Sequence, residues 1–114
     1  MAISDGAKVA IETCLNVKKG ESVLVLTDDS KEAIAQALYE AALNIGAETI
    51  LAKIPTFERD GEEPPVPIAR LMKDSDVVVI ATEKTMSHTM ARRRATRSGA
   101  RVATMPGITV QMMD

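Results

Sequence analysis

The segment "TEKTMSHTMARRRATRSGAR", residues 82–101, carries the side chains of this sequence best suited to acid–base chemistry or anion binding. It contains the chain's single histidine, His88, and five of its arginines. An imidazole titrates near neutral pH and can bind a metal ion, whereas a guanidinium binds carboxylates and phosphates. The segment therefore indicates a catalytic histidine, a nucleic-acid surface, or a helix with a basic outer face.

A metal centre or a catalytic set is not expected from the residues of this chain. A zinc or iron site needs several converging ligands, but the sequence offers one histidine and one cysteine, Cys14, on helices that we place far apart. H-E-x-x-H is absent, and no serine occupies a G-x-S-x-G turn between a strand and a helix. We therefore predict no catalytic residue and no metal ligand within this chain.

Charge and composition argue against a nucleic-acid partner. The formal net charge is −2 and aromatic residues make up 2% of the chain, so the sequence offers neither a global positive field nor a surface for base stacking. On a helix over residues 88–98, Ala91, Ala95 and Ser98 would face the sheet while the arginines face outward. A solvated basic face is the favoured interpretation, and contacts with an anion, a carboxylate or another domain are the alternative.

The start of this helix supplies the candidate contacts. Ser87 is expected to cap it, and His88 would fall in its first turn, where the positive end of the dipole favours a neutral imidazole. A structural hydrogen bond is the favoured role for that histidine. The candidate cleft or interface contacts are Ser87, His88, Arg92, Arg93, Thr82, Pro106 and Gly107.

A second polar group, residues 27–30 and 82–85, follows the apolar runs "VLVL" and "VVVIA". If these runs are neighbouring parallel strands, the group lies at the switch point where such sheets bind ligands. Paired aspartates could hold Mg²⁺ there, as in a receiver domain, but "IATEK" lacks the aspartate that would accept a phosphoryl group. No glycine-rich loop follows, so dinucleotide binding is not expected. We interpret Asp28 and Asp29 as helix caps, with Asp29 and Glu32 as a D-x-x-E pattern and Ser30 as the rival cap.

The elements that must position these residues alternate along the chain. Apolar periodicity, caps and glycine stops predict helices over 4–17, 29–45, 68–73 and 88–98, and strands over 23–26, 48–55, 76–82 and 101–105. Pro67 is expected in the first turn of the third helix, and Lys53 suggests an edge strand. The alternation predicts a three-layer α/β/α domain with a four-stranded, mainly parallel sheet in the flavodoxin- or Rossmann-like order 2-1-3-4.

Length and cysteine content bound the class of protein. The 114 residues suit one α/β domain, 1–114. No apolar run approaches the roughly 18 residues that span a bilayer, and the N-terminus does not resemble a signal peptide. The single cysteine fits a reducing compartment. We therefore expect a soluble cytoplasmic protein with no membrane and no nucleic-acid partner.

Several segments together resemble a known enzyme family. "LNVKKGESVLVLTDD", "ALYEAALNIGAETILAKIP" and "GEEPPVPIARLMKDSDVVVIATEKTMSHTMARRRATRSGARVATMPGIT" are similar to the N-terminal region of the aminopeptidase T family, a group of leucyl-aminopeptidase-like metallopeptidases. Iron-dependent dihydroxypyridine dioxygenases are also similar to this family. The most specific parts are the "GE" turn before the first strand, the "EEPP" loop, and "SHTMARRRATRSGAR" followed by "MPGIT".

This resemblance implies an N-terminal α/β domain that precedes a C-terminal domain carrying the metal ligands. A divalent zinc, cobalt or iron ion would be bound there, so no cofactor is expected in this chain. The implied partners are that C-terminal catalytic domain or a second subunit, a peptide substrate in the full-length enzyme, and further copies in a homo-oligomer. Two alternatives stay open: the N-terminal domain of a ring-cleaving dioxygenase, and a stand-alone flavodoxin-like binding module.

Overall fold

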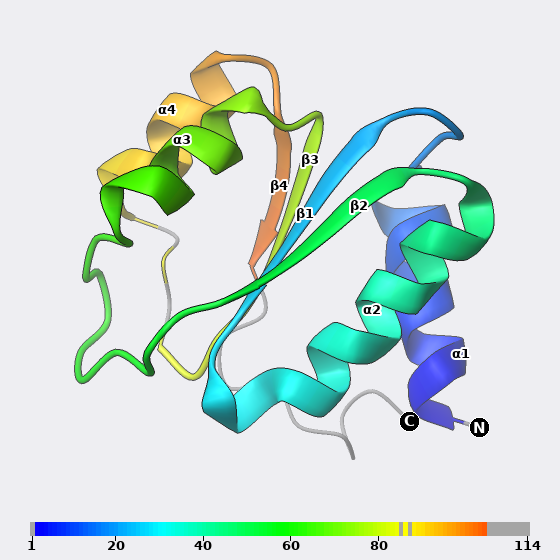
Figure 1. The fold of residues 1–114 in the computed structure, drawn as a ribbon, viewed down its shortest axis with the longest axis horizontal. Coiled ribbons are helices and arrows are strands. Elements are labelled where there is room, and N and C mark those ends of the chain that lie inside the picture. Colours follow the sequence, from blue (N-terminus) through cyan, green and yellow to red (C-terminus); the bar gives the residue numbers. More distant parts are fainter. Residues whose placement is uncertain (1, 85, 87, 105–114) are drawn as a thin grey trace.

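Four parallel strands form the centre of the protein, for which the computed structural model describes residues 2–84, 86 and 88–104 (Figure 1). The strands are β1 (Ser22–Thr27), β2 (Glu48–Lys53), β3 (Val77–Ala81) and β4 (Arg101–Thr104). Their order across the sheet is β2-β1-β3-β4, and every neighbouring pair is parallel. The predicted class, α/β with sheet order 2-1-3-4, is confirmed.

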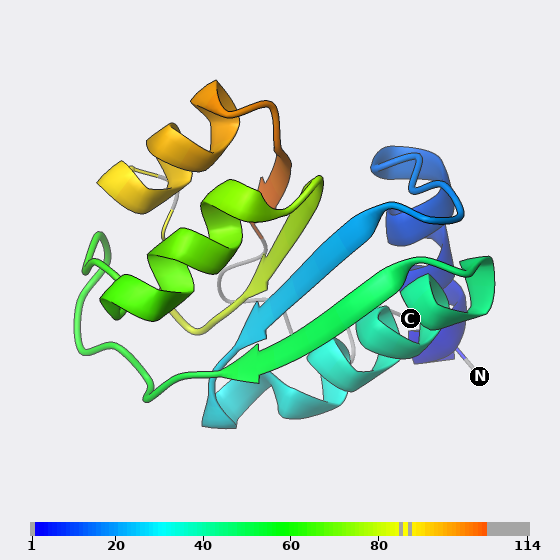
Figure 2. The same cartoon turned by 45° about the horizontal axis from the view of Figure 1, so that its top comes forward.

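Helices cover both faces of this sheet and complete the three layers (Figure 2). They are α1 (Ala2–Val9), α2 (Glu32–Ile45), α3 (Val66–Asp74) and α4 (Met90–Arg97). A π-helical turn, Ala10–Cys14, continues α1, and a 3-10 turn, Asp29–Lys31, leads into α2. The helices α1 and α2 pack together on one face, and α3 and α4 pack together on the other.

The central strands are apolar on both sides because each side faces a pair of helices. In β1, Val23 and Val25 belong to the core under α1 and α2, while Leu24 and Leu26 belong to the core under α3 and α4. All five residues of β3 are likewise buried. The edge strand β2 is only partly buried, and its Lys53 is exposed. The predicted positions of "VLVL", "VVVIA" and Lys53 are therefore confirmed.

The helix ends follow some of the sequence signals and depart from others. Gly46 ends α2 in the left-handed conformation at φ 96°, as its glycine predicted. Pro67 lies in the first turn of α3, as expected, although that helix begins at Val66 and extends to Asp74. The first helical segment ends at Cys14 and not at residue 17, because the chain turns at Asn16, which has a φ of 50°.

One predicted cap is confirmed and the others are wrong. Asp28, one of the two aspartates interpreted as caps, accepts from the Ser30 N–H and caps the turn before α2, whereas neither Asp29 with Glu32 nor Ser30 supplies a cap there. Helix α4 begins at Met90 with Thr89 as its N-cap, whereas Ser87 lies outside the described residues.

The predicted helix over 88–98 is therefore too long at both ends. His88 lies in the turn before α4 and not in its first helical turn. Ala91 and Ala95 are buried as expected, but Ser98 follows the helix and is exposed.

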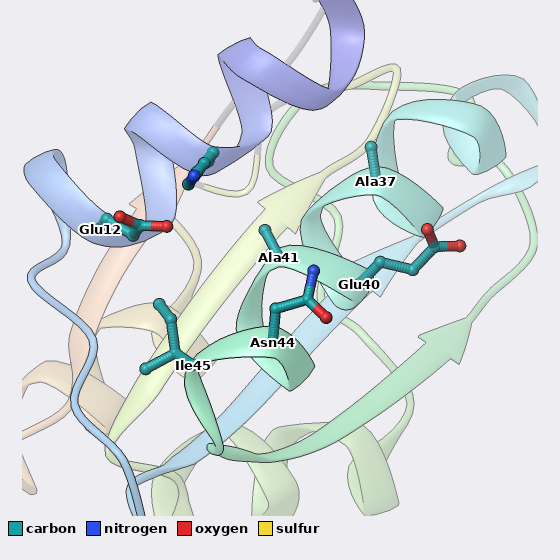
Figure 3. Close-up of a pocket in the computed structure, with 7 residues that line it drawn as sticks. Glu12, Ala37, Glu40, Ala41, Asn44 and Ile45 are labelled. Atoms are coloured by element: carbon teal, nitrogen blue, oxygen red, sulfur yellow. The ribbon is translucent and has the colours of Figure 1, made fainter. Parts of the chain in front are cut away.

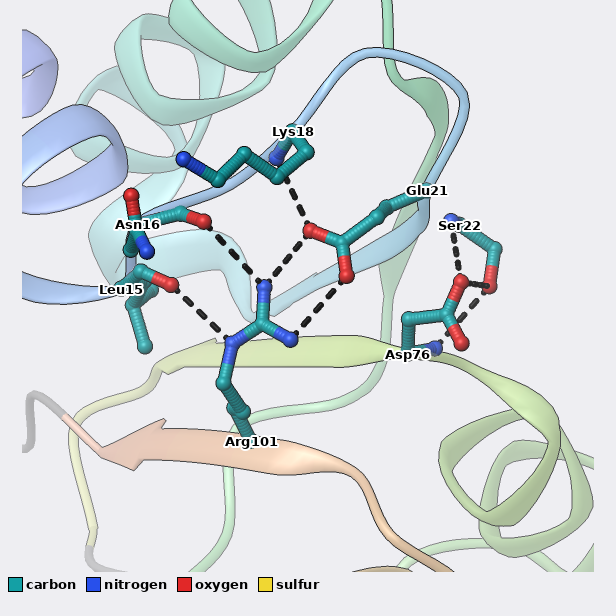
Figure 4. A network of polar contacts seen from close by, with 7 residues as sticks. All are labelled: Leu15, Asn16, Lys18, Glu21, Ser22, Asp76 and Arg101. Carbon is teal, nitrogen blue, oxygen red and sulfur yellow. Dashed lines mark hydrogen bonds and ion pairs between the residues drawn. The ribbon is translucent and has the colours of Figure 1, made fainter.

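A polar network joins the amino ends of the strands (Figure 4). The Arg101 guanidinium donates two hydrogen bonds to the Glu21 carboxylate, at 3.0 and 2.6 Å, and its Nε donates to the Leu15 carbonyl at 3.0 Å. The bonds from Arg101 to Glu21, followed by one from the Lys18 N–H, lower the pKa of Glu21 below its ordinary value, and the bond with Glu21 raises the pKa of Arg101. The network fixes the turn before β1 against β4, the edge strand that lies beyond β3 in the sheet.

None of the helices within residues 2–84, 86 and 88–104 combines the length and the apolar character that spanning a bilayer requires.

Candidate functional site

The carboxyl ends of β1 and β3 are joined by the buried carboxylate of Asp28. This residue is 1% exposed. Its Oδ1 accepts from the Ser30 N–H at 3.0 Å and from the Ser30 hydroxyl at 2.7 Å. Its Oδ2 accepts from the Glu83 N–H at 2.9 Å, on the loop after β3. Three donors thus satisfy a charge that would be costly to bury alone.

A second contact joins the same two loops. Lys31, only 8% exposed, places its Nζ 3.5 Å from Oε1 of Glu83, whose side chain is 44% exposed. The Glu83 carboxylate forms an ion pair with Lys31, and the Glu83 N–H donates to Asp28. These two contacts hold the loops after β1 and β3 in one arrangement.

The two threonine hydroxyls at this edge also have partners. Thr27 donates to the Asp28 carbonyl at 3.2 Å, and Thr82, 1% exposed, donates to the Lys84 carbonyl at 2.6 Å. The hydroxyls of Thr27 and Thr82 and the carboxylate of Asp28 therefore bind groups of these same two loops, and their chemistry is that of a rigid support for the loops. Thr85, which was placed in this group from the sequence, lies outside the described residues.

Two residues from different parts of the chain, Thr89 and Glu63, accept hydrogen bonds from the free backbone N–H groups at the amino end of α4. Thr89 accepts from the Arg92 N–H at 3.2 Å and donates to the Met86 carbonyl at 2.8 Å. The Glu63 carboxylate accepts from the Met90 N–H at 2.7 Å and from the Ala91 N–H at 3.2 Å. Glu63 thus ties the acidic loop after β2 to the helix, with a charge that suits the positive end of its dipole.

The other sequence-predicted contacts are spread over this region. His88 and Arg93 are exposed, whereas Arg92 is half-buried. Among the residues that the structure describes, the buried Nε of Arg92 has no hydrogen-bond partner, which marks it as a donor in need of an acceptor. Ser87, Pro106 and Gly107 lie outside the described residues. The structure therefore places Thr82 at the end of β3 and the remaining described candidates at and before α4.

Sequence reasoning missed the roles of Lys31 and Glu63. The residues next to Lys31 in the sequence do not predict that its side chain is buried. Glu63 lies in the "EEPP" motif, but its partners are 27 and 28 residues away, and no spacing rule relates a loop carboxylate to a distant helix. In the part of the chain that the structure describes, no three His, Cys, Asp or Glu side chains gather to hold a metal ion.

A separate hollow lies between α1 and α2 on the opposite side of the sheet (Figure 3). Its volume is about 420 Å³, and it is lined by Lys8, Glu12, Ala37, Glu40, Ala41, Asn44 and Ile45. None of the sequence-predicted contacts that the structure describes lines it. Its mixed charges and open apolar floor show no convergent set of reactive groups.

Comparison with solved structures gives two similar folds. A 2,5-dihydroxypyridine dioxygenase from Pseudomonas putida KT2440 is similar over 91% of this chain, with a TM-score of 0.73 and 17% identity. AmpT from Thermus thermophilus is similar over 92% of this chain, with a TM-score of 0.61 and 15% identity. The likeness is one of fold. It confirms, at that level, the resemblance to aminopeptidase T and to dihydroxypyridine dioxygenases.

This chain spans only about a third of each of those proteins, 33% of the dioxygenase and 35% of AmpT. No protein-family model matches the sequence, and no curated protein matches it.

Proposed function

We propose that this chain is the N-terminal α/β domain of an aminopeptidase T-like metallopeptidase that removes residues from the amino ends of peptides. The observation that carries the proposal is the 2-1-3-4 fold, which matches AmpT over 92% of this chain but only 35% of AmpT. The sequence motifs described above support the same family. The catalytic zinc, cobalt or iron ion would be bound by a separate C-terminal domain, in a cytoplasmic homo-oligomer.

In this proposal the chain forms part of the cleft wall or of a subunit interface. The half-buried Arg92 is the described candidate best suited to that role, because its buried Nε has no acceptor within residues 2–84, 86 and 88–104. A carboxylate or carbonyl from another domain would satisfy it. The buried network around Asp28 supports this role by holding the neighbouring loops rigid.

One observation favours a second candidate, the N-terminal domain of an iron-dependent ring-cleaving dioxygenase. The dioxygenase has the higher TM-score of the two similar structures, 0.73 against 0.61. A stand-alone binding module remains the third candidate.

Sequencing the gene beyond the codon for Asp114 is the first test. The proposal expects a downstream region rich in histidine and acidic residues, and a coding sequence that stops at Asp114 would contradict it. The longer product and the 114-residue chain are then assayed for hydrolysis of leucine p-nitroanilide with Zn²⁺ or Co²⁺. They are also assayed for oxygen-dependent cleavage of 2,5-dihydroxypyridine with Fe²⁺. We expect peptidase activity in the longer product alone, whereas dioxygenase activity alone would favour the second candidate.

Two substitutions then test the role of the region around α4 in that longer enzyme. His88→Ala and Arg92→Ala should lower turnover or the oligomer size measured by light scattering. Arg97→Ala is the control, since Arg97 is an exposed arginine of the same helix. Unchanged kinetics and unchanged oligomer size in both variants would refute a contact role for this region.

A further inference from the structure

The helices α3 and α4 lie side by side (Figure 2), and a groove runs between them. One part, of about 250 Å³, is lined by Val66, Ala69, Arg70, Lys73, Ala91 and Arg94. A second part, of about 230 Å³, adds Glu63, Pro64 and Met90 and shares Val66, Ala69, Ala91 and Arg94 with the first. The shared lining makes the two parts one continuous feature, called here the α3–α4 groove.

The lining of this groove is apolar and has large side chains exposed at one end. Val66 is 63% exposed and Met90 is 53% exposed, and both line the second part. The floor between the helices is made by the small side chains Ala69 and Ala91. Single exposed apolar residues are common on protein surfaces. Two large ones from different helices beside one hollow form a patch of the kind that binds other proteins.

The rim of the groove is basic. It carries Arg70, Lys73 and Arg94, and all three are exposed. Within the described ranges, none of them forms an ion pair with a carboxylate. The acidic residue beside them, Glu63, has its carboxylate bound to the backbone of α4. Three uncompensated cations thus surround an apolar floor in a chain whose net charge is −2.

We infer that the α3–α4 groove binds an acidic amphipathic helix of a protein partner. The apolar side chains of such a helix would lie against Val66, Ala69 and Met90, while its flanking carboxylates would meet the basic rim. The helices that form the groove have nine and eight residues, so they offer about 12–14 Å of length, or two to three helical turns of the partner.

Charge selects this occupant over a second copy docked through the same face. A symmetric dimer would place Arg70, Lys73 and Arg94 of one copy opposite the same residues of the other, and like charges there repel. An acidic helix would be attracted to the basic rim, whereas a second copy would be repelled by it. The groove is also distinct from His88 and Arg92, which do not line it, so its ligand can be tested apart from the proposed function.

The test uses the 114-residue chain and a fluorescein-labelled helical peptide of about four turns, with leucines on one face and glutamates on the other. A matched peptide carries lysines in place of the glutamates. We expect saturable binding in fluorescence anisotropy, at least about tenfold tighter for the acidic peptide and weaker at high salt. Equal binding of both peptides, or no saturable binding, would overturn the inference.

Two pairs of variants locate the binding. Arg94→Glu should weaken binding of the acidic peptide about three- to tenfold. Arg97→Glu changes an arginine on the same helix but outside the groove lining, and it should weaken binding less than twofold. Val66→Ser should also weaken it, whereas Val9→Ser, at a valine 54% exposed on α1, should not. Circular dichroism verifies that each variant is folded. Equal effects within each pair would overturn the inference.

Sedimentation equilibrium tests whether a second copy of the chain occupies the groove, because it measures the oligomeric state in solution. We expect Arg94→Glu and Val66→Ser to leave the oligomeric state of the free chain unchanged. If instead the chain self-associates and both variants abolish that association, a second copy covers the groove and the inference is wrong.

Discussion

Replacing Asp28 by asparagine should destabilise the fold far more than the same change at the neighbouring aspartate. Asp28 is 1% exposed and receives three hydrogen bonds, two from Ser30 and one from the Glu83 N–H. An asparagine that keeps its oxygen toward Ser30 must turn its NH₂ group toward the Glu83 N–H. Two donors would then face each other in a buried site.

The cost follows from these contacts. One buried donor without an acceptor costs about 1–3 kcal/mol. The two bonds from Ser30 also lose their charge assistance, which makes them weaker by roughly half. We therefore expect Asp28→Asn to lower the free energy of unfolding by about 2–3 kcal/mol. In a domain of this size that corresponds to about 10 °C in the melting temperature.

Asp29→Asn is the matched control. The Asp29 side chain is 72% exposed, and its main contact is an ion pair of 3.1 Å with Lys53, whose side chain is 49% exposed. Such exposed pairs contribute little because water and salt screen them. We expect a loss of about 0.5 kcal/mol or less.

Urea unfolding followed by circular dichroism measures both free energies. Amide hydrogen exchange, read by NMR, reports on the contact itself, and the Glu83 amide should exchange faster in Asp28→Asn than in Asp29→Asn. Equal losses in the two variants, or unchanged exchange at Glu83, would refute the assignment of Asp28 as the link between the two loops.

Three further predictions concern the rest of the fold. Arg101→Ala should cost about 1–2 kcal/mol in urea unfolding, because partly exposed charged hydrogen bonds are lost. Because folding lowers the pKa of Glu21, its contribution is present above the ordinary value of 4.5 and is lost as the pH falls below it. That part of the acid sensitivity should vanish in the Arg101 variant. Glu63→Gln should speed amide exchange at the start of α4, whereas Glu62→Gln, whose bonds stay within its own loop, should not. Leu38→Ala should cost about 2–5 kcal/mol, because that side chain is fully buried.

Each of these three has a clear contrary outcome. An acid-unfolding curve of the same shape in Arg101→Ala and in the unmodified chain would contradict the role of Glu21. Equal exchange in the two glutamate variants would show that Glu63 does not restrain α4. A loss below about 1 kcal/mol for Leu38→Ala would contradict its place in the core.

The order of the elements and of the strands could be predicted because the signals involved are local. The runs "VLVL" and "VVVIA" are apolar at every position, as strands covered on both faces must be, and both occupy the centre of the sheet. Gly46 and Pro67 mark helix ends through their own backbone restrictions. These properties do not depend on any distant part of the chain.

The helix caps were harder to predict because several neighbouring residues could serve. Asp28, Asp29 and Ser30 can each accept from a helical N–H, and no local signal distinguishes Asp28 from its two neighbours. The structure selects it because the loop after β3 brings the Glu83 N–H to its other oxygen. At α4 the sequence analysis expected Ser87 as the cap, and the structure has Thr89 in that role.

The sequence by itself determined the class of the fold and the sheet order, because hydrophobic periodicity and chain breakers are local properties. The resemblance to two enzyme families rests on short motifs such as "EEPP" and "MPGIT", and the solved structures confirm it at the level of the fold. Only the tertiary structure decided that Lys31 is buried against Glu83, that Glu63 binds the start of α4, and that Val66 and Met90 flank one basic groove. Each of those contacts joins segments far apart in sequence. They form where the sheet brings the segments together, and the pattern of the segments alone does not specify them.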